Sequence, residues 1–469
     1  MRLATVKPAE PSLQLDRGRW RRALVYGLGA SGRAAASALL HRGYAVLGVD
    51  DRTFAADELG ELRAAGLSVV AATELESLPA ELDVVVKSPG VPPSRPLVAQ
   101  ARAQNVPVIG EIELAFPWLD GDLVGITGSN GKSTTTALTG ALLRGCGFAA
   151  EICGNFGPPL ASLLDGPPGR VFVAELSSFQ LEDSVTLRPK VAALLNVAAD
   201  HLDRHGDLAG YLAAKARIFA RQGPGCVAVL NEDDPLVRDV ALPPGVRRRG
   251  FSRLQPVADG CFVDGAAVVE GHGDGRATEL FRLDDLHLVG PHNLENALAA
   301  ALVARSYAGE ERAPAAALRA AVDEFRALPH RTQLVRERRG VEYYDDSKGT
   351  NPGATERALE GFADGAVHLI CGGRSKGADF SVLRDIVTRK VKALYLIGES
   401  AAELAHALRG TAPMFGTETL ARAVATASAS AASGEVVLLS PACASFDQFR
   451  DFAHRGETFQ RLVRELPGN

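Results

Sequence analysis

The stretch Leu123-Val-Gly-Ile-Thr-Gly-Ser-Asn-Gly-Lys-Ser-Thr-Thr-Thr136 decides what kind of protein this chain is. Its first residues, Leu123 to Ile126, are apolar and predict the end of a buried strand. Glycines follow, then Lys132, Ser133 and a run that predicts a helix. A strand, a glycine-rich loop and a helix start form a cradle for phosphate groups, because glycine lets backbone N–H groups approach the ligand closely.

The residues of this loop have distinct expected roles. Lys132 is expected to reach the β- and γ-phosphates of a nucleotide, and Ser133 or Thr134 to bind Mg²⁺. The spacing departs from the common pattern, since the first glycine, Gly125, comes one position early. Gly-Lys-Ser also occurs by chance, but the strand and helix around it favour a nucleotide site. The predicted ATP-binding loop comprises Gly128, Ser129, Asn130, Gly131, Lys132, Ser133 and Thr134.

The composition is that of an ordinary globular chain. Its 469 residues, 46% hydrophobic and 23% charged, suggest about three domains. A net charge of −5 argues against nucleic acid as the main partner. Six scattered cysteines form no CxxC pair, which indicates neither a disulfide framework nor a zinc site. Without a signal-peptide core or a long apolar run, we expect a cytoplasmic protein with no membrane segment.

A second glycine-rich turn lies near the N-terminus. Ala23 to Tyr26 predicts a strand, and Gly27-Leu-Gly-Ala-Ser-Gly32 predicts a tight turn before a helix. Asp50 and Asp51 end the next strand, about 20 residues after the glycines, as in βαβ units that bind phosphorylated nucleosides. The alternative is a tight turn in a parallel sheet that binds no ligand.

Polar residues follow several further strands. Ser88 comes shortly after Val84 to Val86, at the strand end where open α/β sheets bind ligands. Glu175 ends a strand downstream of the phosphate loop, where a carboxylate commonly manages Mg²⁺ or an attacking water. Asp200-His-Leu-Asp203 has residue types that suit a metal or γ-phosphate site. Without the other motifs, however, a solvent-exposed loop that happens to contain a histidine is the better interpretation of this segment.

Tyr211, Lys215 and Phe219 recur every four residues on one face of a predicted helix. A lysine on an apolar face either extends its ammonium group to water or has a chemical role. The residues alone favour the first interpretation.

The remaining segments predict connections and a third domain. Gly110 to Asp120 predicts a linker, and residues 245–282 predict short strands at a sheet edge. Asn293 is a plausible N-cap of a helix. Beyond Leu328-Pro-His-Arg331, strands alternate with helices and predict another parallel α/β domain.

Together these motifs resemble those of the Mur ligases over nearly the whole chain. The resemblance rests on Thr127-Gly-Ser-Asn-Gly-Lys-Ser133, Glu175-Leu-Ser-Ser-Phe-Gln-Leu-Glu182, Asp200-His-Leu-Asp203, Tyr211 with Ala213-Ala-Lys215, and Leu439-Ser-Pro-Ala-Cys-Ala-Ser-Phe-Asp-Gln-Phe449, among others. It implies an α/β fold with three domains. Residues 1–115 would form a Rossmann-like UDP-binding domain, residues 116–327 a P-loop ATPase-like domain with a parallel sheet, and residues 328–469 a Rossmann-like domain that binds ATP and glutamate.

The resemblance also implies an activity. The family member that fits would add D-glutamate to UDP-N-acetylmuramoyl-L-alanine with ATP and two Mg²⁺ ions, through an acyl phosphate, in peptidoglycan precursor synthesis. Lys215 would carry a carbamate, which turns a cation into an anionic metal ligand. This role replaces the earlier interpretation, in which the Lys215 ammonium group extends to water. Carbamate formation needs a neutral amine, and burial favours the neutral form. We expect a monomer. A related ligase that adds another amino acid, for example L-glutamate, is the alternative, because handedness depends on pocket geometry.

The resemblance assigns roles residue by residue. Catalysis would fall to Lys132, Glu175, His201, Lys215 and Lys348, and metal binding to Ser133, Glu175, His201 and the Lys215 carbamate. ATP would also contact Asn293, Asn296, Arg331 and Asp346. The UDP-linked substrate would contact Ala30, Ser31, Asp50, Asp51, Arg52, Ser88, Asn155 and His201. Glutamate would contact Thr350, Lys376, Ser445, Phe446 and Phe452, with Lys376 pairing its side-chain carboxylate.

Two rival functions come from other classes. A nicotinamide-dependent dehydrogenase would explain the first βαβ unit but leaves the phosphate loop and Lys215 unexplained. A nucleotide switch would hydrolyse ATP whether or not an amino acid is present.

Overall fold

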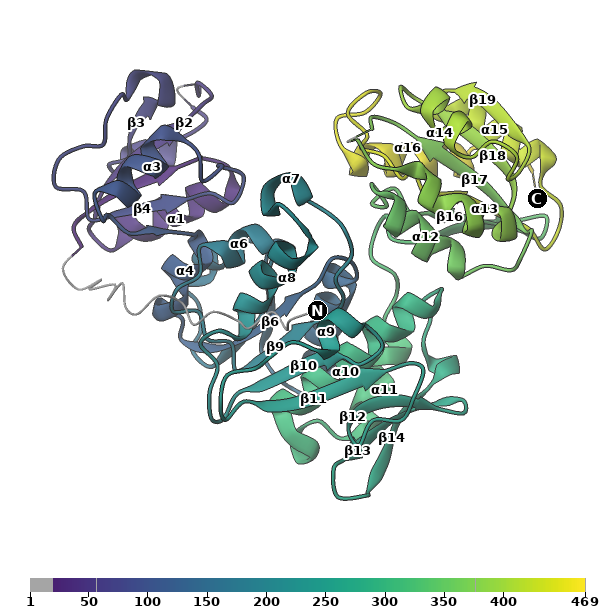
Figure 1. The fold of residues 1–469 in the computed structure, drawn as a ribbon, viewed down its shortest axis with the longest axis horizontal. Coiled ribbons are helices and arrows are strands. Elements are labelled where there is room, and N and C mark those ends of the chain that lie inside the picture. The colour runs from purple at the N-terminus through teal and green to yellow at the C-terminus, as the bar shows by residue number, and fades with distance from the viewer. Residues whose placement is uncertain (1–19, 56, 376, 469) are drawn as a thin grey trace. The chain divides into compact units, whose positions relative to one another are not determined.

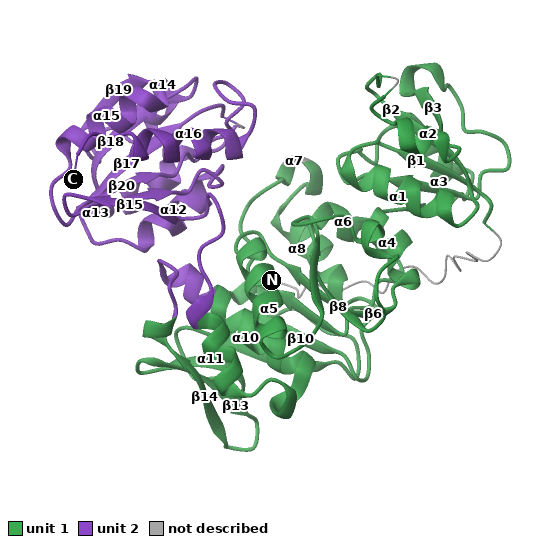
Figure 2. Ribbon diagram, turned by 180° about the vertical axis from the view of Figure 1, so that it is seen from behind, with its two compact units in different colours: residues 1–285, 296–322 green, residues 286–295, 323–469 purple. Residues whose placement is uncertain are grey.

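The computed structural model describes residues 20–55, 57–375 and 377–468 (Figure 1). The chain divides into two compact units (Figure 2). Unit 1 consists of residues 1–285 and 296–322, and unit 2 of residues 286–295 and 323–469. Within the described residues, unit 1 contains two β-sheets and unit 2 contains one. The α/β class with three sheets is thereby confirmed, while the three predicted domain boundaries stay a prediction.

Unit 1 begins with a five-stranded parallel sheet. Its order is β3 (Ser68–Ala71), β2 (Ala45–Asp50), β1 (Arg22–Tyr26), β4 (Val84–Lys87) and β5 (Val108–Ile109). Helices α1 (Ala30–His41), α2 (Gly60–Ala64) and α3 (Pro96–Ala103) connect its strands. The turn between β1 and α1 requires glycine at position 32, because a Cβ there would lie 1.8 Å from the Gly27 carbonyl oxygen. The predicted tight βαβ turn is confirmed.

A nine-stranded sheet forms the larger part of unit 1. Its order is β14 (Ala277–Arg282), β13 (Ala267–His272), β12 (Asp259–Asp264), β11 (Arg247–Ser252), β10 (Val227–Asn231), β9 (Val191–Leu194), β6 (Gly121–Thr127), β8 (Arg170–Glu175) and β7 (Ala150–Gly154). Strands β6 to β12 all pair in parallel with one another, and β13 pairs antiparallel with both its neighbours, β12 and β14. The short strands expected in residues 245–282 are confirmed at this edge (Figure 1).

Helices follow the strands of this sheet along the chain. They are α5 (Lys132–Gly145), α6 (Ser178–Glu182), α7 (Leu202–His205), α8 (Leu208–Ala216) and α9 (Pro235–Arg238). Strand β8 is buried along its whole length and β6 from Leu123 onward, as expected of parallel strands inside a doubly covered sheet. None of the described helices is long and apolar enough to cross a membrane.

The predicted linker from Gly110 to Asp120 lies between β5 of the first sheet and β6 of the second, and it contains a helix. Its first half is helix α4 (Glu111–Ala115), which is buried throughout. The Glu113 carboxylate accepts hydrogen bonds of 3.0–3.1 Å from the backbone N–H groups of residues 185–187. Burial raises the pKa of neighbouring Glu111 to about 7. These buried carboxylates fasten α4 to residues 161 and 185–187, so the segment is a structural connection.

Unit 2 contains a six-stranded sheet. Its order is β15 (Gln333–Arg338), β16 (Val341–Asp345), β20 (Val436–Leu439), β17 (Val367–Gly372), β18 (Val391–Ile397) and β19 (Met414–Glu418). Only the edge strand β15 is antiparallel to its neighbour among these strands. Helices α12 (Pro352–Glu360), α13 (Arg384–Lys390), α14 (Ala401–Ala407), α15 (Leu420–Ser430) and α16 (Phe452–Arg464) accompany it. The predicted third α/β sheet is confirmed.

Helices α10 (Pro291–Arg312) and α11 (Ala315–Glu324) contain two of the three points at which the chain passes between units; the third lies between residues 285 and 286. The expectation that Asn293 caps a helix is wrong, because α10 already begins at Pro291. The Asn293 side chain instead donates a hydrogen bond of 2.7 Å to the Val289 carbonyl.

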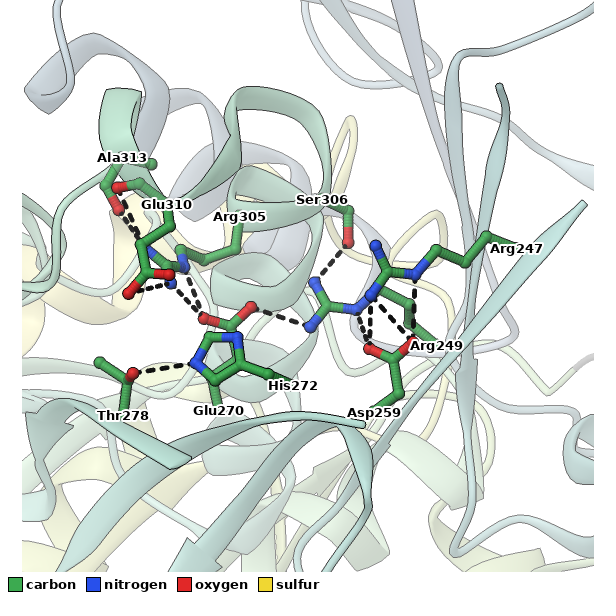
Figure 3. Close-up of polar contacts among 10 residues, drawn as sticks. All are labelled: Arg247, Arg249, Asp259, Glu270, His272, Thr278, Arg305, Ser306, Glu310 and Ala313. Carbon is green, nitrogen blue, oxygen red and sulfur yellow. Dashed lines mark hydrogen bonds and ion pairs between the residues drawn. The ribbon is translucent and has the colours of Figure 1, made fainter. Parts of the chain in front are cut away.

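A buried ion network fastens α10 to the strands at the end of the nine-stranded sheet (Figure 3). Glu270 on β13 accepts hydrogen bonds from Arg249 on β11, at 2.8 Å, and from Arg305 on α10, at 2.6 Å. Figure 3 shows the two guanidinium groups reaching the carboxylate from opposite sides. All three side chains are at most 4% exposed. The network therefore holds three segments together without contact with water.

The Glu270→Ala variant should lose about 3 kcal/mol of unfolding free energy in urea denaturation, because two buried guanidinium groups lose the carboxylate between them, while Arg249 keeps Asp259 at 2.7 Å. The control is Glu279→Ala on β14, whose side chain is half exposed and lies 3.9 Å from Arg282; it should lose less than about 0.5 kcal/mol. Equal losses of unfolding free energy in the two variants would show that the buried network stabilises the fold no more than an exposed ion pair does.

Candidate functional site

The phosphate loop follows β6, which lies between β9 and β8 in the nine-stranded sheet. Gly131 has a φ of +83°, and a Cβ at this position would lie 2.1 Å from Asn296 Oδ1. Only glycine fits this backbone and this close contact. Gly125 is not part of the loop: it lies within β6, and a Cβ there would press on Ile218 and Pro189. The unusual glycine spacing thus has a packing origin.

The segment after β9 holds the phosphate loop in shape. Asn196 accepts a hydrogen bond of 2.9 Å from Asn130 N–H through Oδ1, and donates one of 3.1 Å from Nδ2 to the Asn130 carbonyl. Its own carbonyl accepts the Ser129 N–H at 2.9 Å. The Ser129 hydroxyl also accepts from the Ala198 N–H and donates to the Ala198 carbonyl. Sequence reasoning did not give Asn196 a role. The available signal was its place shortly after the apolar strand Val191–Leu194, which the structure shows to be paired with β6.

Two lysines meet at one carbonyl of the loop. Lys132 Nζ donates to the carbonyls of Gly128 and Ser129, both at 2.8 Å. Lys215 Nζ donates to the same Gly128 oxygen at 2.7 Å and lies 4.3 Å from the centre of the Tyr211 ring. Lys215 is only 1% exposed, and burial, followed by the Lys132 charge, lowers its pKa well below the ordinary value. The structure thus favours a neutral Lys215 amine.

A serine and two further side chains form an oxygen-rich cluster beside the loop. Ser133 Oγ donates to Glu175 Oε2 at 2.5 Å, and Asn155 Nδ2 donates to Glu175 Oε1 at 2.7 Å. A hydroxyl and a carboxylate suit Mg²⁺, which is commonly held by one or two carboxylates together with phosphates and water. In the described part of the chain no group of three or more His, Cys, Asp or Glu could hold a metal ion. A Mg²⁺ ion held here by Ser133 and Glu175 would take its other ligands from phosphate oxygens or water.

His201 lies at the exposed end of a row of rings. Its side chain is 48% exposed, its backbone has a φ of +53°, and Nε2 is 3.7 Å from Asp200 Oδ2. Its ring centre is 4.9 Å from that of Phe179, which stacks on His205, and His205 in turn lies 5.1 Å from Tyr211. The row leads from His201 to the ring that covers Lys215. His205 was missed by sequence reasoning, although its spacing of four from His201 was visible.

The predicted uracil residues lie at the end of β2. Asp50 Oδ2 accepts the Leu28 N–H at 2.6 Å and Oδ1 accepts the Arg52 N–H at 2.9 Å, so this carboxylate holds the glycine turn. Asp51 pairs with Arg95. The Arg52 guanidinium lies 4.8 Å from the centre of the Phe54 ring.

The predicted pyrophosphate and sugar residues follow the neighbouring strands of the same sheet. Ala30 and Ser31 open α1, directly after the glycine turn. Ser88 Oγ donates to the Gly27 carbonyl at 2.7 Å. These residues gather at one edge of the five-stranded sheet, whereas Asn155 belongs to the nine-stranded sheet, beside Glu175.

In unit 2, Asp346 is buried and already bonded. Its oxygens accept the Thr332 N–H at 3.1 Å and the Ser440 hydroxyl at 2.7 Å. Burial raises the pKa of Asp346 to about 7, and the Arg331 charge opposes that rise. The structure thus gives this carboxyl a role in loop shape.

The described glutamate-site residues belong to the same unit: Thr350, Ser445 and Phe446 lie on loops, and Phe452 opens α16. Lys348 Nζ is 3.7 Å from the centre of the Phe452 ring, and the Thr350 N–H donates to the Lys348 carbonyl. Ser445 is buried, and Phe446 is 62% exposed. Lys376 lies outside the described residues.

Arg455, at the start of α16, joins two of these loops. Its fully buried guanidinium donates to the Ser347 carbonyl at 2.9 Å, to Ser347 Oγ at 3.0 Å and to the Cys443 carbonyl at 3.2 Å. It thereby fixes the loop before Lys348 to the loop before Ser445. Sequence reasoning missed it, because an arginine in a polar helix is expected to face solvent.

Three segments of the chain match domains of known proteins. Residues 21–110 match the Mur ligase MurD-like N-terminal domain, residues 126–304 the Mur ligase middle domain, and residues 330–443 the Mur ligase glutamate ligase domain. The chain belongs to the Mur ligase family. A UDP-N-acetylmuramoylalanine–D-glutamate ligase of Koribacter versatilis is 42% identical over 453 residues, which cover 96% of this chain and 98% of that one.

Further comparisons agree with this Mur ligase assignment. A ligase of the same name from Myxococcus xanthus is 44% identical over 455 residues, covering 95% of this chain and 98% of that one. Among solved structures, MurF of Acinetobacter baumannii has a TM-score of 0.61 at 18% identity, covering 95% of this chain and 93% of that one. At this identity the likeness concerns the fold alone.

The Asn196→Ala variant of this Mur ligase should bind ATP about tenfold more weakly in isothermal titration calorimetry. The phosphate loop loses two side-chain hydrogen bonds of about 1 kcal/mol each, part of which ATP binding must replace. The control is Gln104→Ala, since Gln104 is an exposed amide at the end of α3. ATP affinity within twofold of the wild type would contradict the role given to Asn196.

Proposed function

We propose that this Mur ligase joins D-glutamate to UDP-N-acetylmuramoyl-L-alanine at the expense of ATP, as a cytoplasmic step of peptidoglycan precursor synthesis. Relatives named for that reaction are 42% and 44% identical over nearly the whole chain. The observation that carries the proposal is the convergence of Lys132, Glu175 and Lys215 on one phosphate loop. We also propose that the enzyme acts as a monomer.

The chemistry explains why a phosphate loop is needed. A carboxylate is a poor electrophile, so a carboxylate oxygen of the alanyl group first attacks the γ-phosphorus of ATP, and the bond to ADP breaks. The amine of glutamate then attacks the acyl carbon, loses a proton, and phosphate leaves. The products are ADP, inorganic phosphate and the amide. Such transfers depend mainly on positioning and on neutralising charge.

Each residue around the loop has a part in this proposal. Lys132 neutralises the transferring phosphoryl group, and Ser133 with Glu175 holds one Mg²⁺ ion. His201 and a carbamate on Lys215 hold a second one. Bound Mg²⁺ would supply positive charge against the phosphate oxygens. The carbamate forms when the neutral Lys215 amine attacks carbon dioxide and loses a proton, and the low pKa of Lys215 supports this step.

The UDP-linked substrate, ATP and glutamate are assigned to different parts of the chain. We propose that Asp51 and Arg52 recognise the uracil ring, with Asp50 holding the turn beneath them. The pyrophosphate and sugar would contact Ala30, Ser31, Ser88 and Asn155. ATP would also contact Asn293, Asn296 and Arg331, with Asp346 shaping the adjoining loop. Lys348 would lie near the phosphoryl or carboxylate charge, and glutamate would contact Thr350, Lys376, Ser445, Phe446 and Phe452.

Phosphate release should require UDP-N-acetylmuramoyl-L-alanine, D-glutamate and Mg²⁺ together, because ATP is consumed only to activate the carboxylate that glutamate attacks. A coupled phosphate assay with D-glutamate, L-glutamate and D-alanine measures this directly. Turnover with L-glutamate but not D-glutamate would establish the alternative ligase. ATP hydrolysis that ignores the amino acid would refute the ligase proposal.

The Lys215→Ala variant should be about 100-fold less active, because a charged ligand at the phosphoryl-transfer centre is lost. Added acetate or formate should restore part of that activity by replacing the carbamate. The matched control is Lys190→Ala, since the Lys190 side chain is 48% exposed and lies at the start of β9. Full activity of Lys215→Ala would exclude the carbamate role.

A further inference from the structure

A buried ion pair connects the two sheets of unit 1. Lys87 is the last residue of β4 in the five-stranded sheet, and Asp183 directly follows α6, after the nine-stranded sheet's β8. Lys87 Nζ lies 2.8 Å from Asp183 Oδ2, and the side chains are 0% and 4% exposed. Burial raises the pKa of Asp183, and the Lys87 charge opposes that rise. Neither residue has a part in the chemistry proposed above.

The Lys87 ammonium also holds the turn that follows it. It donates to the Val91 carbonyl at 3.1 Å and lies 3.5 Å from the Ser88 carbonyl. The Val91 N–H donates to the same Ser88 carbonyl at 3.0 Å, which closes a turn over residues 88–91. Ser88 is the residue expected to contact the sugar or pyrophosphate. One cation therefore fixes this turn from inside while it is itself fixed by Asp183.

The other end of the pair is close in sequence to the metal-binding carboxylate. Helix α6 begins three residues after Glu175, at Ser178, and is fixed by a capping box between Ser177 and Gln180. Asp183 ends that helix. A short and rigid path thus leads from the Lys87 ammonium to Glu175.

Arg204 on α7 provides a second connection to the same turn. Its guanidinium donates to the Pro89 carbonyl at 3.3 Å and to Glu182 Oε2 at 2.8 Å. Glu182 is the last residue of α6. The turn over residues 88–91 is therefore held from two sides by the segments that carry Glu175 and His201.

Stability alone is a poor explanation for the Lys87–Asp183 pair. A buried ion pair is commonly no more stabilising than apolar side chains of similar size, because both charges lose their hydration. An apolar pair could fill the same space. It could not donate a hydrogen bond to the Val91 carbonyl, and this is what the ammonium adds.

We infer that Lys87 is a positioning residue for the UDP-linked substrate: held by Asp183, it fixes the Ser88–Val91 turn at a set position relative to the Glu175 strand. The inference rests on the proposed function and adds to it the group that aligns the sugar end of the substrate with the phosphoryl-transfer centre. Lys87 touches neither the substrate nor ATP in this role and acts through the turn.

The first test compares ligands that reach the turn with ligands that do not. In Lys87→Met, the Kd of UDP-N-acetylmuramoyl-L-alanine should rise about tenfold, as expected for the loss of one charge-assisted hydrogen bond. The Kd of UMP, which lacks the second phosphate and the N-acetylmuramoyl sugar, and that of ATP should stay within twofold of the wild-type values. Equal weakening of all three ligands would indicate general damage and overturn the inference.

The second test separates positioning from stability. Lys87→Met removes the charge partner at 2.8 Å from the buried Asp183 carboxylate and leaves it the half-exposed Arg102, 4.0 Å away. Lys87→Met with Asp183→Leu replaces the pair by apolar groups and should regain the wild-type melting temperature. The UDP-linked substrate should still bind about tenfold more weakly to this double variant, because no donor reaches the Val91 carbonyl. Wild-type affinity in a double variant of wild-type stability would show that the pair is only structural.

The matched control is Lys190→Met. Lys190 and Asp122 form an ion pair of 3.0 Å in the same unit, but both side chains are nearly half exposed. This variant should bind all three ligands as the wild type does. If the wild-type protein itself fails to bind UDP-N-acetylmuramoyl-L-alanine, the proposed function fails and the inference with it. If the wild type binds and the double variant binds equally well, only the inference fails.

Discussion

Two lysine nitrogens share one backbone carbonyl, and this crowding governs the chemistry of the centre. Lys132 and Lys215 both donate to the Gly128 oxygen, within 2.8 Å, and Lys215 is almost completely buried. Two full positive charges so close together, with little water between them, repel each other strongly. Burial, and after it this repulsion, lowers the pKa of Lys215 well below its ordinary value. A transferring phosphoryl group at Lys132 and a carbamate on Lys215 would relieve the repulsion, since each brings negative charge.

The rest of unit 1 keeps this centre at a fixed place relative to the first sheet. Asn196 shapes the phosphate loop, and Glu113 fastens the segment between the two sheets to residues 185–187. Lys87 and Asp183 join the sheets near their ligand-facing strand ends. Parallel strands present their carboxyl ends at one edge, so each sheet offers one row of loops. Because the two sheets are joined rigidly, their loops keep a fixed position relative to each other. A reaction through an acyl phosphate needs its reacting groups held in this way.

The sequence allowed the local parts of this site to be predicted, because they depend on neighbours in the chain. The phosphate loop, the Glu175 strand and the helix with Lys215 follow from short patterns of glycine, apolar and charged residues. The buried helix in the segment after Gly110 could not be predicted, for the opposite reason. Its glutamates look solvated in sequence, and only partners some 70 positions away bury them. Arg455 and Asp183 escaped notice in the same way, since their partners come from other strands and loops.

The most direct test of the central claim is carbon-13 NMR of the protein incubated with labelled bicarbonate and Mg²⁺. The structure places a buried amine with a lowered pKa beside a cation, so the wild type should show a carbamate carbon signal. Lys215→Arg, which keeps the positive charge but forms no carbamate, should lack that signal. A fully active wild-type enzyme without any carbamate signal, or an unchanged signal in Lys215→Arg, would contradict the account.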